Sequence, residues 1–125
     1  MDPQYPVKIA VQTEYLTHQS APDDERYLFS YTITITNLGD QRITLKSRHW
    51  IITDANGKKT EVQGAGVVGE TPAIEPNTAY QYSSGTVLET PLGFMEGQYL
   101  METAQGRSFY APIDAFRLAV PGMLH

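Results

Sequence analysis

The chain has 125 residues, with 9 basic against 14 acidic residues, a net charge of −5 and no cysteine. The negative charge excludes direct recognition of nucleic acid through phosphate neutralisation. The missing cysteines exclude disulfides, thiolate nucleophiles and zinc–thiolate or iron–sulfur sites. The length fits one domain, residues 1–125, with one hydrophobic core.

The N-terminal residues 1–6 lack the basic start and the apolar run of a leader peptide. No stretch of about 18 consecutive apolar residues occurs anywhere in the sequence. We therefore expect a cytoplasmic protein that does not insert into a membrane.

Two segments alternate apolar and polar side chains with a period of two residues. In residues 27–36 the odd positions are aromatic or aliphatic and most even positions carry a hydroxyl, and residues 7–11 alternate in the same way. Only a strand sorts such residues onto two faces, because a helix would spread them around its circumference. The row expected to face the core is Tyr27, Phe29, Tyr31, Ile33 and Ile35.

A third strand is predicted over residues 43–52, between turns at residues 37–40 and 54–57, and we expect antiparallel hairpins at both turns. After a long middle loop, three further β segments are predicted over residues 80–88, 95–103 and 109–120. Pro112, inside the last segment, is restricted to an edge strand, a bulge or a strand start because it has no amide hydrogen. The pattern predicts an all-β sandwich of antiparallel strands.

Two aromatic residues have expected structural roles. Residues 74–82 have the spacing of the corner motif of fibronectin type III domains, in which a tyrosine hydroxyl bonds to the chain upstream. We assign that role to Tyr80, and the alternative is an ordinary half-buried strand residue. Trp50, the single tryptophan, is expected in the core, with an exposed partner-binding role as the alternative.

Residues 64–69 match G-x-G-x-x-G, the spacing of dinucleotide-binding loops. Pro72 and Pro76 leave no room for the helix that such a site requires, so we reject a Rossmann site. A glycine-rich loop can still direct amides at an anion without a helix, and a purely structural role for the glycines is the alternative. The candidate ligand-binding residues and their counter-charges are Gly64, Gly66, Gly69, Lys58 and Lys59.

Signals for catalysis and metal binding are weak. His18, His49 and His125 are too far apart in sequence to form a local metal motif, and residues 23–25 lack the ligand ladder of a calcium loop. The serines at residues 83–84 have no G-x-S-x-G context. We predict no catalytic residue, no metal site and no cofactor.

Several segments in order and spacing resemble the ApaG family of bacteria over nearly the whole chain. These segments are residues 20–27, 48–50, 61–69, 84–85, 89–93 and 116–118. The resemblance implies a fibronectin type III-like sandwich, an association with cobalt resistance and magnesium efflux, and pyrophosphate binding by Gly64, Gly66 and Gly69. Related domains inside eukaryotic F-box proteins are assumed to bind proteins.

Three functions follow as hypotheses. The first is a non-catalytic module that binds a protein partner through edge strands and loops. The second is a small-ligand module that holds a pyrophosphate-containing molecule in the 64–69 loop. The third is direct cation binding by Asp23, Asp24 and Glu25. The sequence contains no indication of the oligomeric state.

Overall fold

The structure, a computed structural model, describes residues 5–122, so His125 and the first four residues lie outside the described part. The strands are β1 (Val7–Tyr15), β2 (Tyr27–Asn37), β3 (Ile43–Asp54), β4 (Lys59–Ala65), β5 (Ala73–Ile74), β6 (Ala79–Leu88), β7 (Leu92–Thr103) and β8 (Ser108–Ala119). Two short 3-10 turns, η1 (Thr17–Gln19) and η2 (Pro22–Asp24), join β1 to β2. Within residues 5–122 no helix has the length and apolar composition needed to cross a membrane.

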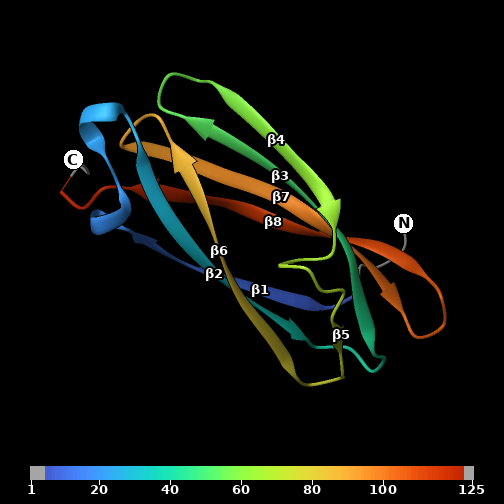
Figure 1. The fold of residues 1–125 in the computed structure, drawn as a ribbon. Coiled ribbons are helices and arrows are strands. Elements are labelled where there is room, and N and C mark those ends of the chain that lie inside the picture. The colour runs from blue at the N-terminus through green and yellow to red at the C-terminus, as the bar shows by residue number, and fades with distance from the viewer. Residues whose placement is uncertain (1–4, 123–125) are drawn as a thin grey trace.

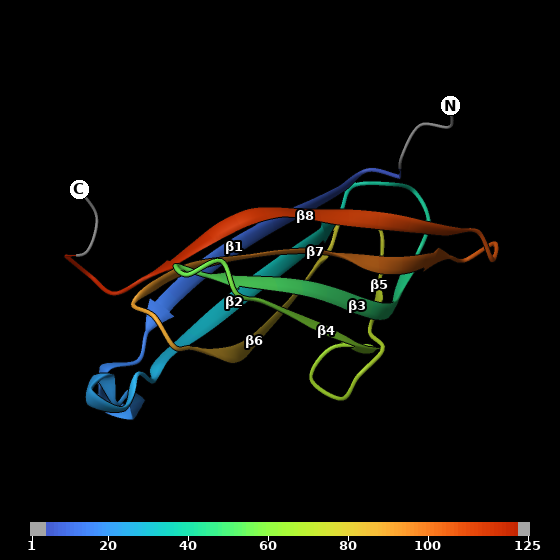
Figure 2. The ribbon, with the colours of Figure 1, turned by 90° about the horizontal axis from the view of Figure 1, so that it is seen from above.

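The strands form two antiparallel sheets that face each other (Figures 1 and 2). The smaller sheet has the order β1-β2-β6, and the larger has the order β4-β3-β7-β8, with the short β5 paired to the start of β3. This confirms the antiparallel sandwich that the alternation predicted and the fibronectin type III-like arrangement that the resemblance implied.

The predicted inward row of β2 is confirmed. Phe29, Tyr31, Ile33 and Ile35 are buried, and Tyr27 packs against the same core from a half-buried position. Trp50 is 2% exposed and its ring contacts those of Tyr31, Tyr99 and Phe116 edge-on, so its core role is also confirmed.

Of the two expected hairpins, the one at residues 54–57 is present and the one at residues 37–40 is not. β3 and β4 pair across residues 54–57, and β7 and β8 pair across residues 104–107, where Gly57 and Gly106 have positive φ. The hairpin expected at residues 37–40 is wrong, because β2 and β3 belong to opposite sheets. The chain crosses there because the fully buried Asn37 donates from Nδ2 to the carbonyls of Gln41 and Ile74.

The expected long middle loop is also wrong in part, since it contains β4 and β5. β4 carries one large apolar residue, Val62, among mostly exposed polar residues, so its strand character comes from pairing with β3 rather than from its own pattern. Pro112 lies, as predicted, on an edge strand, and the β7–β8 register shifts nearby at Met95 and Gly97.

The tyrosine corner is wrong. Tyr80 is half-buried and its hydroxyl forms no hydrogen bond within residues 5–122, which matches the alternative of an ordinary strand residue. Its neighbour Tyr82 instead points inward and shares a hydrogen bond with the hydroxyl of Tyr99 on the opposite sheet. Burial raises the pKa of both hydroxyls, so the neutral forms join the two sheets.

Candidate functional site

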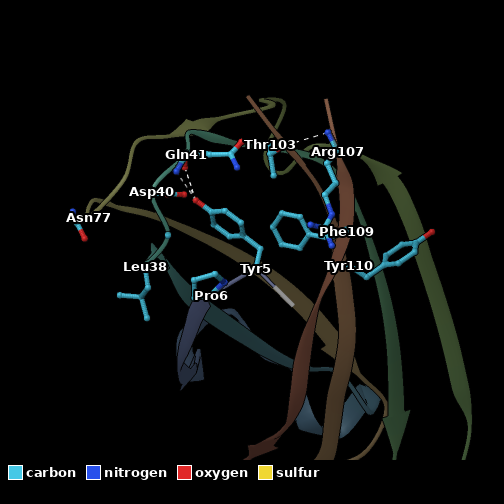
Figure 3. A pocket seen from close by; sticks show the side chains of 11 residues that line it. Tyr5, Pro6, Leu38, Asp40, Gln41, Asn77, Thr103, Arg107, Phe109 and Tyr110 are labelled. Carbon is cyan, nitrogen blue, oxygen red and sulfur yellow. Dashed lines mark hydrogen bonds between the residues drawn. The ribbon is translucent and has the colours of Figure 1, made fainter. Parts of the chain in front are cut away.

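A pocket lies at the end of the sandwich that holds the start of β1 and the β7–β8 turn, and we call it the end pocket (Figure 3). It has a volume of about 850 Å³. Its walls come from segments far apart in the sequence: Tyr5, Pro6, Leu38, Gly39, Asp40, Gln41, Asn77, Thr103, Arg107, Phe109 and Tyr110.

The floor of the end pocket is a fixed aromatic pair. The rings of Tyr5 and Phe109 stack with centroids 5.2 Å apart, and they face each other in Figure 3. The Tyr5 hydroxyl donates to the carbonyl of Gln41 at 2.7 Å and accepts from the Gln41 amide at 2.9 Å. A Cβ at Gly39 would lie 2.2 Å from the Tyr5 ring, so a glycine is needed there for the ring to reach its place.

The rim of the end pocket carries both exposed apolar side chains and charged ones. Leu38 is 53% exposed and Tyr110 is 55% exposed, and Tyr110 points outward from the ring pair (Figure 3). Asp40 and Arg107 place one charge of each sign on the rim. An aromatic floor with few polar groups at its edge suits the apolar side chains of a partner.

The 64–69 loop folds mainly inward. The amide of Gly66 donates to the Lys46 carbonyl, and Val67 and Glu70 exchange hydrogen bonds across a tight turn. Val67 itself is fully buried in the core. The amides of Val68 and Gly69 at the tip have no hydrogen-bond partner within residues 5–122.

The structure does not bring the two candidate lysines to this loop. Lys59 is paired opposite Thr53 and Gly64 opposite Arg48, so they stand five strand steps, roughly 16 Å, apart along β4. Lys58 forms an exposed ion pair with Glu89 at 2.9 Å, which raises the pKa of Lys58 through its hydrogen bond and charge.

Arg48 is the cation that stands at the loop. Its Nη1 donates to the carbonyls of Ala65 and Gly66, and its guanidinium covers Gly64, where a Cβ would lie 2.9 Å from Nη1. Arg48 therefore links β3 to the loop through these hydrogen bonds. This contact depends on the pairing of β3 with β4, which the sequence did not reveal.

The remaining candidates for metal binding and catalysis lie apart from the end pocket and the 64–69 loop. Within residues 5–122 no group of three or more His, Cys, Asp or Glu side chains is placed to hold a metal ion, and Asp23, Asp24 and Glu25 do not converge. His49 pairs with Glu61 at 2.9 Å on the outer face of the larger sheet.

Sequence reasoning missed the end pocket. Its two floor residues are separated by most of the chain, and neither belongs to a recognisable motif. Gly39 was the one indication in the sequence, because a glycine beside a strand end marks either a turn or a place where another group approaches the backbone closely. The sequence did not show that this group is the ring of Tyr5.

A sandwich with sheets in the orders β1-β2-β6 and β4-β3-β7-β8 belongs to the class of fibronectin type III-like domains. Residues 17–103 match the family model described as "ApaG domain". The chain belongs to the ApaG family.

Relatives match over almost their whole length. "Protein ApaG" of Shewanella piezotolerans is 70% identical over 120 residues, 96% of this chain and 95% of that protein. The solved structure of a putative ApaA protein from Bordetella pertussis is 41% identical, with a TM-score of 0.92, and covers 95% of this chain and 97% of that one. A second solved structure, the structural genomics target SoR45, is 66% identical with a TM-score of 0.91, and the match covers 95% of this chain and 90% of that one.

Proposed function

We propose that this chain is a non-catalytic module of the ApaG family that binds a protein partner at the end pocket. The observation that carries the proposal is the exposed apolar rim, Leu38 and Tyr110, above a rigid floor of stacked rings. Partner surfaces are commonly held by such accessible aromatic and aliphatic side chains. The association of the family with cobalt resistance and magnesium efflux would then operate through the bound partner.

The rigidity of the floor favours binding. Tyr5 is held by two hydrogen bonds to Gln41, and Asn37 fixes the neighbouring crossover through its bond to the same carbonyl. A partner would therefore meet a preformed surface and would lose little free energy to ordering it.

The test is quantitative affinity capture from native lysate of the source cells with three baits. The baits are the wild type, a Leu38→Ser/Tyr110→Ser double variant, and a Phe94→Ser control that removes an exposed apolar side chain elsewhere. We expect a partner that the wild type and the control retain and the double variant loses. A wild-type bait that recovers nothing above background, or a double variant that recovers the same partners, overturns the proposal.

A second candidate is an anion-binding role for the 64–69 loop. It is favoured by the unbonded amides of Val68 and Gly69, both in residues with positive φ, in a loop whose Ala65 and Gly66 carbonyls accept hydrogen bonds from the Arg48 guanidinium. Titration with pyrophosphate and diadenosine tetraphosphate, followed by amide NMR shifts, decides it. Unchanged signals for Gly64, Gly66 and Gly69 at millimolar ligand would remove this candidate.

A further inference from the structure

We propose that the free edge of β6 accepts one extended segment of a partner protein as an added fourth strand of the smaller sheet. This rests on the proposed function, that the chain binds a protein, and it adds a second contact site with a defined chemistry. The occupant is an uncharged segment with aliphatic side chains at alternate positions.

β6 is an edge strand without the features that normally block pairing. It contains no charged residue and no proline, and its register with β2 runs without a bulge from Tyr27 and Leu88 to Thr36 and Ala79. Edge strands usually carry lysine, proline or a bulge to prevent the addition of another strand. β6 therefore differs from an ordinary protected edge.

The other three edges of the sandwich are protected. β1 carries Lys8 and Glu14 and packs beside β8 along the closed side of the sandwich. β8 has Pro112 and a register shift, and β4 carries charged residues at its exposed positions. The contrast singles out β6 as the edge that remains open to pairing.

The outward backbone groups of β6 are unused. Within residues 5–122, residues 80–88 form no backbone hydrogen bond outside their ladder with β2. An edge strand directs alternate amides and carbonyls away from its neighbour, so these groups are available to an added strand. A depression beside β6 lies at Thr86, Val87 and Leu88. We therefore place the added strand along the second half of β6, Ser83 to Leu88.

The two sheets differ in width by one strand on this side. Tyr82 of β6 reaches Tyr99 of β7, so β6 faces the interior strands of the larger sheet and β4 extends beyond it. The space beside β6 and above β4 is the position that a fourth strand fills in immunoglobulin domains with an ABED sheet. Figure 1 shows no strand of the smaller sheet outside β6.

The depression of about 220 Å³ beside β6 has an apolar part, formed by Ile52 and Val62 of the larger sheet. Its lining also includes Thr60, Asp54 and the Lys58–Glu89 ion pair. Ile52 and Val62 are only partly buried against the core and form a row beside β6. Val87 is 42% exposed and lies on the outer face of β6, because Tyr82 and Leu88 are the buried positions of that strand. An added strand would place its alternate inward side chains on the row of Ile52 and Val62 and bury it.

The same geometry disfavours a second copy of the chain as the occupant. Antiparallel pairing of two β6 strands about a two-fold axis would place both larger sheets on the same face of the joined smaller sheets. The β4 strand of each copy would then occupy the place of the other copy's β3. There is room for a single strand, whose spacing from β6 would be about 4.8 Å.

The experiment uses the full chain and a phage-displayed library of short random peptides. Enriched peptides are synthesised and bound to the labelled protein for NMR. We expect uncharged sequences with alternating aliphatic residues, cross-strand contacts from the peptide backbone to Ser83–Leu88, and slowed exchange of the outward amides of β6.

A pair of variants on β4 provides the control. Thr60→Trp fills the space facing the added strand and should weaken peptide binding about tenfold. Lys59→Trp places the same side chain on the opposite face of the same strand and should leave binding unchanged. Both residues are exposed, so neither variant disturbs the core.

The outcomes separate this inference from the proposed function. Peptides that contact only the end pocket would overturn the β6 site and leave protein binding standing. Failure to enrich any peptide, equal effects of the two variants, or concentration-dependent pairing of β6 with a second copy would each overturn the added strand. The three-bait capture tests the proposed function independently of these results.

Discussion

At the scale of single residues, the most strained position is Val68. It is an exposed β-branched residue with φ of 43°, and it is followed by Gly69 with φ of 81° in the turn closed by Val67 and Glu70. Two positive φ values are the pattern of a type I′ turn, which favours Asn-Gly. Val68→Asn should raise the free energy of unfolding by about 1 kcal/mol, measured by urea denaturation.

The control for this prediction is Val87→Asn. Val87 is also exposed, but it lies in the extended strand β6, where asparagine is a poor strand former. We expect a small loss of stability at Val87 against the gain at Val68. Equal losses at the two positions would contradict the strain at the turn.

The residue scale also shows why Asn37 and Gly39 could not be assigned their roles from the sequence. Both stand in Asn37-Leu38-Gly39-Asp40, which has the composition of any turn. Whether such a turn closes a hairpin or crosses between sheets depends on the acceptors of the Asn37 amide, the carbonyls of Gln41 and Ile74. The second acceptor is distant in sequence, so local pattern alone favoured the commoner hairpin.

At the scale of elements, the Tyr82–Tyr99 pair links β6 to β7 across the core. Tyr82→Phe leaves the fully buried hydroxyl of Tyr99 without this partner and should cost about 1–3 kcal/mol of unfolding free energy. The Tyr82→Phe/Tyr99→Phe double variant should lose less than the sum of the two single variants. Chemical denaturation of all four proteins measures the coupling, and strictly additive losses would contradict a shared hydrogen bond.

The same pair predicts a dependence of stability on pH. Burial raises the folded-state pKa of both hydroxyls above the ordinary value of 10.0, so above that pH the unfolded chain loses protons that the folded chain keeps. The contribution of these two neutral hydroxyls to the free energy of unfolding is therefore complete below about pH 10 and declines as the pH rises further. The double phenylalanine variant should show a shallower decline in a series of urea titrations between neutral and alkaline pH.

Two glycines in strands give another prediction at this scale. A Cβ on Gly97 of β7 would lie 2.0 Å from the His49 carbonyl oxygen, at the register shift, whereas a Cβ on Gly85 of β6 would meet its nearest atom at 3.4 Å. Gly97→Ala should destabilise by about 2 kcal/mol because the paired backbone of β3 must move. Gly85→Ala should be close to neutral in the same thermal or urea melt. A small loss of stability at both positions would contradict this prediction, because it would show that the backbone of β3 can shift at little cost in free energy.

The sequence revealed those strands whose own alternation of apolar and polar residues is sufficient to predict them. β2 is apolar on one face along its whole length, and its register and burial agree with that pattern. β4 was missed because mostly exposed polar residues acquire strand structure only through the ladder with β3. Strand propensity reflects packing against neighbours, and those neighbours are not visible in a local window.

At the scale of the whole molecule, the two candidate sites differ in how well the sequence alone could predict them. The 64–69 loop was visible as a motif, and its partner Arg48 follows once β3 and β4 are paired. The end pocket joins residues near the N-terminus to the crossover and to the start of β8. No spacing rule connects such segments, because their proximity results from how the two sheets are stacked.

The unequal width of the two sheets also predicts how the molecule opens. β2, β3 and β7 each have a strand on both sides, whereas β4 pairs only with β3. The residues of β4 are also mostly exposed. Native-state hydrogen exchange in low denaturant should therefore release the amides of β4 by a local opening with a small denaturant dependence. The amides in the ladders of β2 and β7 should exchange only through global unfolding, with the slope of the urea transition. If β4 exchanged with that same slope, the side of the sandwich where we place the added strand would already be tightly closed.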